Sequence, residues 1–366
     1  MRVGAARAIQ GGLALVGITF FVLLLTDADF GGIPAASLQM LPQFILVVLG
    51  LVILNYTFDT ASWWLVCGHK RPPIWRLMLI RLRTEAITNV VPGGAVIGEP
   101  MKIGLLGEAS GMSRTEATTS FLLSKFVLIL GQTIYILLGL ALSWSVINAV
   151  SEEAFNVENF GLIVLAGALL ILGIILSIAA AMIWFQPMNS RLRFTTRTGR
   201  IANTWNLILR ELRDIEHLVA REFRRYPWRF VLAIIFSFIS WSLNGVELWA
   251  IAQWLDIPIT FQQAYAIDAV SVVVRMVIFV IPIGMGGQDW TIAGLTAAHA
   301  IPDPTASAAR MVLMKRSREF FVIGIGLVLL LVMPGRGRGV KGRSIAEGPQ
   351  QEGCAGADSA GSNTDV

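Results

Sequence analysis

Ionisable side chains inside otherwise apolar segments are the strongest candidates for chemistry in this sequence. Residues 77–107 read LMLIRLRTEAITNVVPGGAVIGEPMKIGLLG, a mostly apolar stretch with five charged residues. Charged groups at the depth of a bilayer usually face a protein interior or a water-filled cavity, and they often mark binding or transport sites. This segment therefore supplies six candidate substrate-binding residues: Arg81, Arg83, Glu85, Asn89, Glu99 and Lys102.

The same segment is interrupted at Pro92, Gly93 and Gly94. A helix needs about 20 mostly apolar residues to cross a bilayer, so neither half of the segment spans it alone. Irregular backbone at membrane depth is tolerated where it is buried in protein or lines a wet cavity. We expect a re-entrant helical hairpin, and an amphipathic helix on the membrane surface followed by a loop is the alternative.

A second interrupted segment covers residues 261–300. Asp268 and Arg275 lie two helical turns apart in its first part, and we expect them either to bind substrate or to pair with each other. The break falls at Gly284, Gly286 and Gly287. Two further candidate site residues follow directly, Gln288 and Asp289.

The longer apolar segments hold the remaining candidates. Lys125 lies in a predicted helix over residues 117–145, which the capping box of Ser113 and Glu116 should begin. Glu247 lies inside a predicted span over residues 230–255, and Lys315 and Glu319 are spaced to pair along the last helix, residues 305–333. The candidates on that last helix are Arg316, Arg318 and Glu319.

The composition identifies a membrane protein. Hydrophobic residues make up 55% of the chain and charged residues 14%, against about a quarter charged in soluble domains. The net charge of +5 is explained by basic connections between spans, so no nucleic-acid partner is expected. Two cysteines and three scattered histidines predict no disulfide framework and no metal site, and we expect no cofactor.

The order of elements predicts an all-α polytopic membrane protein in a single domain, residues 1–333. Its six expected spans are residues 8–26, 41–66, 117–145, 160–185, 230–255 and 305–333, with the two broken elements as additional re-entrant hairpins. Residues 151–159 read as an acidic loop, residues 186–229 as a basic amphipathic segment, and residues 334–366 as a disordered tail.

The distribution of charge predicts the topology. The connections at 27–40, 149–158, 256–263 and 301–304 hold seven acidic residues and no Lys or Arg. By the positive-inside rule both termini and residues 186–229 are cytoplasmic. The first hairpin then opens inward and the second outward, which makes residues 8–147 and 160–333 an inverted repeat. The 32-residue spacing from Gly93 to Lys125 recurs from Gly286 to Arg318.

Several motifs resemble a known family. NVVPGGAVIGEPMK, GVELWAIAQWL, and IPIGMGGQDW followed by the basic last helix are similar to the flippase-like domain of the lysylphosphatidylglycerol synthases. The similarity covers residues 11–334 and is closest to stand-alone relatives associated with hopanoid biosynthesis. It implies movement of a lipid, or a lipid-linked amino acid or sugar, across the bacterial inner membrane. The second glycine motif and Gln288-Asp289 depart from the family pattern. We expect this chain to lack the soluble aminoacyl-transferase domain of the full synthases, and therefore not to aminoacylate lipids.

These observations favour a lipid translocase with a membrane lipid as its substrate. Arginine and lysine would bind the head-group phosphate, and the carboxylates would neutralise them when the site is empty or carry protons. A membrane-embedded transferase is the alternative, with Glu85, Glu99 or Asp289 as general base. A scaffold that binds lipid-biosynthesis enzymes through residues 186–229 is a third hypothesis. For each charged residue, an ion pair that only holds helices together is the structural alternative.

Single cysteines test the predicted topology. In a chain whose Cys67 and Cys354 are replaced, Glu153→Cys should react with a membrane-impermeant thiol reagent in intact cells. Arg197→Cys should stay unlabelled, because basic connections remain on the cytoplasmic side. Labelling of Arg197→Cys from outside would contradict the topology.

Overall fold

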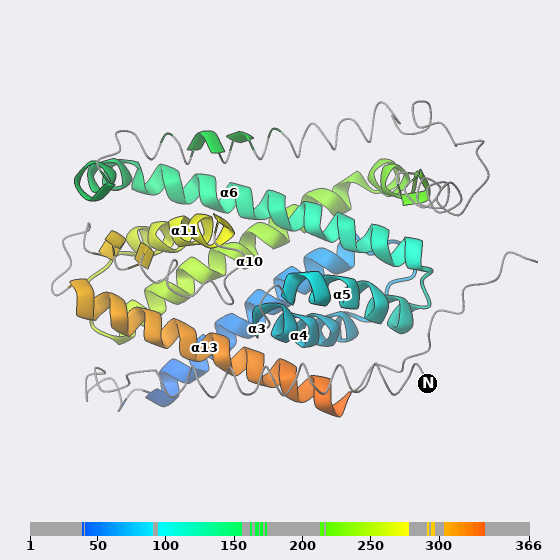
Figure 1. Cartoon of the computed structure of the whole chain (residues 1–366), viewed down its shortest axis with the longest axis horizontal. Coiled ribbons are helices and arrows are strands. Elements are labelled where there is room, and N and C mark those ends of the chain that lie inside the picture. The colour runs from blue at the N-terminus through cyan, green and yellow to red at the C-terminus, as the bar shows by residue number, and fades with distance from the viewer. Residues whose placement is uncertain are drawn as a thin grey trace, which may run out of the picture. The chain divides into compact units, whose positions relative to one another are not determined.

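The described part of the chain is all-α. The computed structural model describes residues 39, 41–90, 94–155, 162, 165–167, 169–170, 173, 213–215, 217–277, 291–292, 294–296 and 304–333, and no strand occurs among them. This confirms the predicted fold class (Figure 1). The predicted span 8–26 and the tail 334–366 lie outside these residues, as do most of 160–185 and of 186–229.

Among the described residues, three helices are long and apolar enough to cross a membrane. They are α3 (Leu41–Leu65), α6 (Arg114–Phe155) and α10 (Pro227–Trp254), each at a predicted span. The last long helix, α13 (Pro304–Val332), has the required length but carries several charged residues in its first half. The described residues thus contain three clear spans, and the predicted total of six stays a prediction.

Helix α6 begins as predicted and ends later than predicted. The Glu116 backbone N–H donates to Ser113 Oγ at 3.2 Å, and the Ser113 N–H donates to Glu116 Oε2 at 2.8 Å, which is the predicted capping box. The helix continues to Phe155, so the loop prediction was wrong for residues 151–155. Those residues contain no glycine or proline to interrupt the backbone.

The first interrupted segment is an antiparallel helical hairpin. Helix α4 (Ile74–Val90) and helix α5 (Gly94–Ser110) pack against each other, and the breaking residues Pro92 and Gly93 lie outside the described residues. Arg76, near the start of α4, donates to the carbonyl of Ala109, near the end of α5, at 3.4 Å. Because α4 also packs on α3 and α13, it is an internal element of the bundle rather than a surface helix.

The second interrupted segment begins at its predicted residue. Helix α11 (Phe261–Val277) starts at Phe261, and short helical pieces follow at residues 291–292 and 294–296. Gly284, Gly286, Gly287, Gln288 and Asp289 lie outside the described residues.

The helices pack through contacts between the two halves of the sequence. Helix α10 packs on α3 and α6, α11 packs on α6, and α13 packs on α4 (Figure 1). Gly139 of α6 meets Ala269 of α11, where an added Cβ would lie 2.2 Å from the alanine Cβ. Gly326 of α13 meets α4, where an added Cβ would lie 2.4 Å from the Leu82 carbonyl oxygen and 2.7 Å from Ala86 Cβ. Such small residues let helix backbones approach closely in a membrane.

Two glycines on α13 provide a matched test of this packing. Gly326→Ala should lower the thermal stability of the purified protein in detergent, because overpacking against backbone costs about 1–3 kcal/mol. Gly324→Ala should leave stability equal or raised, since an added Cβ there meets nothing within 4 Å and alanine favours helix. Equal melting of the two variants would show that α13 does not contact α4 as described.

Candidate functional site

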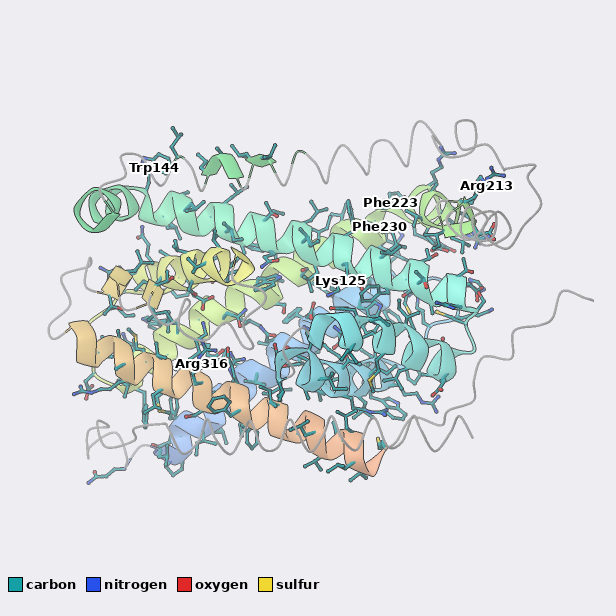
Figure 2. All side chains as sticks on the ribbon, viewed as in Figure 1. Lys125, Trp144, Arg213, Phe223, Phe230 and Arg316 are labelled. Atoms are coloured by element: carbon teal, nitrogen blue, oxygen red, sulfur yellow. The ribbon has the colours of Figure 1, made fainter. Side chains whose placement is uncertain are left out.

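A polar cavity lies among α3, α4, α5 and α6. Its volume is about 180 Å³, enough for several water molecules. Figure 2 shows Lys125 on α6, beside the α5 helix of the hairpin. The cavity is lined by Asp59, Ser62 and Trp63 of α3; Arg81, Glu85, Thr88 and Asn89 of α4; Glu99 and Lys102 of α5; and Phe121, Ser124, Lys125 and Leu128 of α6.

The cavity lies well inside the bundle. Arg81 is seven residues beyond the start of α4, Glu99 eleven before the end of α5, and Lys125 eleven beyond the start of α6. At 1.5 Å per residue these side chains attach about 10 to 17 Å from helix ends that share one side of the bundle. The hydrocarbon core of a bilayer is about 30 Å thick, so helix ends at its boundary would put these side chains near its middle.

Aromatic and basic side chains gather at those helix ends. Arg71 lies over the Trp64 ring at 4.6 Å, Arg76 over the Trp75 ring at 5.2 Å, and Arg229 over the Tyr226 ring at 3.7 Å. Aromatic residues are enriched at the head-group level of membranes, and arginine reaches the lipid phosphates there. This end of the bundle has the composition of a membrane interface.

Arg81 connects three sides of the cavity. Its Nη1 pairs with buried Asp59 of α3, and its Nε lies 3.4 Å from Glu85 Oε2, one turn along α4. The guanidinium also lies 5.3 Å from the centre of the Tyr56 ring, and Tyr56 interacts electrostatically with Glu85. Two carboxylates and an aromatic ring therefore fix the orientation of Arg81.

Glu99 is shared by two lysines. Its Oε1 lies 2.6 Å from Lys125 Nζ, and its Oε2 lies 3.8 Å from Lys102 Nζ. Three basic and three acidic side chains line the cavity, so their formal charges cancel. An anionic group entering the cavity would meet two ammonium groups whose shared counter-ion is one carboxylate.

The structure separates Arg83 from this site. Arg83 follows Arg81 by two residues, which is about 200° around a helix of 3.6 residues per turn. Its Nη2 donates to the backbone carbonyl of Met333, just beyond the end of α13. Arg83 is therefore not among the residues that line this cavity, because its helical phase directs it to α13, and its role in substrate binding stays a prediction.

A second charged cluster lies where α13 meets α10 and α11. Lys315 of α13 pairs with Asp268 of α11, and Tyr135 of α6 donates to Asp268 Oδ2 at 2.7 Å. Arg318 Nε lies 2.9 Å from Glu247 Oε1 of α10. Figure 2 shows Arg316, also on α13, whose Nη1 donates to Glu319 Oε2 at 2.7 Å.

In this cluster, the partners of Lys315 and of Asp268 differ from those expected from the sequence. The predicted pair of Lys315 with Glu319 was wrong, because Lys315 instead neutralises a carboxylate that is completely buried on another helix. Both oxygens of Asp268 have partners other than Arg275. The Arg275 side chain itself lies outside the described residues.

The sequence reasoning missed three functional candidates. Asp59 is a single carboxylate within an apolar span, a signal that suffices to nominate a residue. Tyr56 and Tyr135 gave no signal in the sequence, because a tyrosine side chain is neutral at pH 7 and does not stand out in an apolar segment. Only their contacts with Glu85 and Asp268 identify them.

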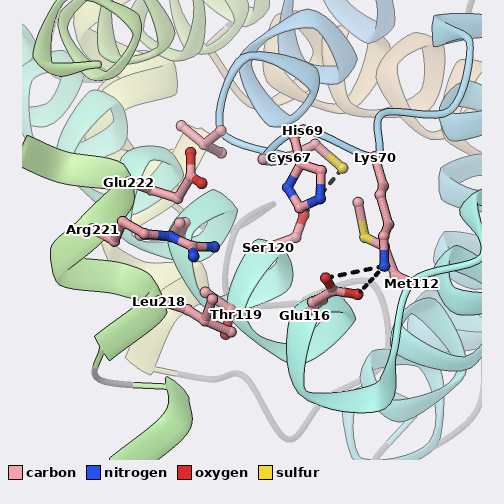
Figure 3. A pocket seen from close by; sticks show the side chains of 13 residues that line it. Cys67, His69, Lys70, Met112, Glu116, Thr119, Ser120, Leu218, Arg221 and Glu222 are labelled. Carbon is pink, nitrogen blue, oxygen red and sulfur yellow. Dashed lines mark hydrogen bonds and ion pairs between the residues drawn. The ribbon is translucent and has the colours of Figure 1, made fainter. Parts of the chain in front are cut away.

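A smaller cavity of about 30 Å³ lies near the start of α6 (Figure 3). Lys70 and Glu116 pair there at 2.9 Å, and Ser120 Oγ donates to the Cys67 sulfur at 3.2 Å. Burial raises the pKa of the Cys67 thiol to about 11, so it is protonated and poorly nucleophilic at neutral pH. In the residues that the structure describes, no three His, Cys, Asp or Glu side chains group as a metal site.

Comparison with protein families gives one extensive match. The family model described as the lysylphosphatidylglycerol synthase TM region matches residues 9–335. A search of curated proteins found no significant match. The predicted family is confirmed, and the closer relation to hopanoid-associated proteins stays a prediction.

The Asp59 and Arg81 pair can be tested by a double-mutant cycle. Arg81→Gln should strongly lower thermal stability, because removing one partner of a buried pair costs about 3–5 kcal/mol. Adding Asp59→Asn should recover part of that loss, since the buried charge of Asp59 is then removed and only the partly exposed Glu85 lacks its partner. Additive effects of the two changes, measured as melting in detergent, would show that the side chains do not interact.

Proposed function

The chain belongs to the lysylphosphatidylglycerol synthase TM family, and from this premise we propose that it is a lipid translocase of the bacterial inner membrane. Family membership supports a lipid-related role at the membrane. The translocase proposal adds a head-group path through the cavity that contains Arg81, Glu99 and Lys125.

The observation that carries the proposal is a charged cavity inside the helical bundle, away from the helix ends. A phospholipid head group does not readily cross about 30 Å of hydrocarbon unaided. A site halfway across, with polar groups already oriented, replaces the water that the head group loses. Phosphate oxygens would accept hydrogen bonds from Lys102 and Lys125, and Glu99 would yield its place between them.

The surroundings of the cavity suit a lipid rather than a soluble anion. Ile97 on α5 and Leu122 on α6 are exposed, and they belong to the same two helices as Glu99 and Lys125. Lys125 itself is 35% exposed and lies 5.5 Å from the centre of the Phe121 ring. Acyl chains could therefore remain against an apolar surface while the head group enters the cavity.

An inverted repeat would provide alternating access. On α4, Ala86 follows Glu85 and packs on Gly326 of α13; on α11, Ala269 follows Asp268 and packs on Gly139 of α6. Each half thus presents the same acid–alanine pair to a glycine of the other half. This correspondence aligns Gly139 of the first half with Gly326 of the second. The 32-residue spacing in the sequence instead aligns Lys125 with Arg318, so the two alignments differ in register.

The positions of buried carboxylates agree with this symmetry. Asp59 lies six residues before the end of α3, which leads into a basic connection, and Glu247 lies seven before the end of α10, which leads into an acidic one. By the positive-inside rule these helix ends lie on opposite sides, and both termini are cytoplasmic. Transporters with inverted repeats bind substrates near the bilayer midplane between such halves.

Reconstitution tests the proposal. The full chain in phosphatidylglycerol-containing vesicles should move fluorescent phosphatidylglycerol between leaflets, measured by quenching of the outer leaflet with dithionite. Lys125→Gln should slow this exchange about tenfold or more, because a hydrogen bond to a charged group contributes about 1.5–3 kcal/mol.

Lys70→Gln is the matched control. Lys70 also pairs with a glutamate, but it lies at the smaller cavity, outside the proposed path. Its exchange rate should equal that of the unmodified chain. Vesicles in which the unmodified chain moves no phosphatidylglycerol would count against translocation of this lipid class, and native mass spectrometry would then identify any co-purifying lipid.

A further inference from the structure

We propose that the buried Asp268–Lys315 pair is a proton-binding site that couples proton movement to lipid movement. The inference rests on the proposed translocase function and adds its energy source. It concerns the cluster at α10, α11 and α13 rather than the head-group cavity.

The geometry of Asp268 is that of a closed site. Its side chain has no exposed surface, and its two oxygens have separate partners: Lys315 of α13 at Oδ1 and the Tyr135 hydroxyl of α6 at Oδ2. One carboxylate therefore joins a helix of the first half to two helices of the second. A change in its charge alters contacts on both sides at once.

The charged and titratable groups around Asp268 come from each helix that packs on it. They are Tyr135 from α6, Glu247 from α10, Lys315, Arg318 and Glu319 from α13, and Tyr265 on α11 itself.

Lysine is the basic partner suited to a proton-linked change. In the Arg318–Glu247 and Arg316–Glu319 pairs the planar guanidinium presents a rigid fork of donors to the carboxylate. A lysine ammonium is a compact charge on a flexible stem, so Lys315 can turn away from a carboxyl group that has taken up a proton. The most deeply buried carboxylate of the cluster is thus paired with lysine, whereas its two neighbours are paired with arginine.

The coupling step is a single protonation. A hydronium ion gives its proton to Asp268 Oδ1 and becomes water, while the Lys315 ammonium turns away from Oδ1 and keeps its three N–H bonds and its charge. The attraction between α11 and α13 is lost, and the three acidic and three basic side chains of the cluster no longer balance. Release of the proton to the opposite side restores the pair, so one proton crosses per cycle.

A proton fits this site better than a metal cation does. The Lys315 ammonium already occupies the place beside Oδ1 that a cation would take. The Tyr135 hydroxyl donates to Oδ2, so its hydrogen faces the carboxylate. A metal ion would have to displace both donors.

One residue connects this cluster with the head-group cavity. Arg318 interacts electrostatically with Asp268, Glu247 and Tyr56, and Tyr56 interacts in the same way with Glu85 at the cavity wall. Protonation of Asp268 changes the field at Arg318 and, through Tyr56, at Glu85. The head-group site therefore responds to the occupancy of the proton site.

The test uses the full chain in vesicles containing phosphatidylglycerol and a trapped pH indicator. An imposed gradient of about two pH units, a roughly hundredfold ratio of proton concentration, should accelerate movement of fluorescent phosphatidylglycerol severalfold. A protonophore should remove the acceleration. The trapped indicator should report proton flux that requires the lipid.

The Asp268→Asn variant should move lipid at the same rate with and without the pH gradient, because the amide cannot take up the proton. Glu116 lies in the exposed pair with Lys70, and the Glu116→Gln variant should be accelerated by the gradient as much as the unmodified chain. If Asp268→Asn does not fold, the unmodified chain still decides the question. An exchange rate that is the same with and without the gradient would overturn this inference alone. Complete absence of exchange would overturn the proposed translocase function as well.

Discussion

Ionised side chains at bilayer depth need partners, and much of this bundle is arranged to provide them. Asp59 pairs with Arg81, Glu99 with Lys125, Glu247 with Arg318, and Asp268 with Lys315. Each of these pairs joins two different helices. Leaving one member alone in a low-dielectric interior is strongly unfavourable, so the pairs constrain which helices become neighbours.

The two charged clusters differ in exposure to solvent, and this difference suits them to the two proposed roles. The cavity side chains are partly exposed, as Lys125 and Glu85 show, and they adjoin open space that a head group can enter. Asp268 is fully buried and has partners at both oxygens. A solvated site suits exchange of a large polar group, whereas a closed site suits a ligand as small as a proton.

Local sequence signals predicted the elements but not their pairing. The glycine break after Pro92 separates α4 from α5, and the capping box at Ser113 begins α6, because both features act within a few residues. Asp268 and Lys315 are 47 residues apart, and nothing local indicates that they meet. Arg81 and Arg83 were equivalent candidates in the sequence, and only the helical phase relative to α13 separates them.

The contact between Arg83 and the Met333 carbonyl has a consequence for how the protein can be modified or extended. A helix end is usually free to fray, but here a side chain of the hairpin fixes the point where α13 ends. Any domain or reporter joined after this point would start from a position attached to α4. A fluorophore placed there would report movement of the hairpin directly, and an appended enzyme would be held beside the same element.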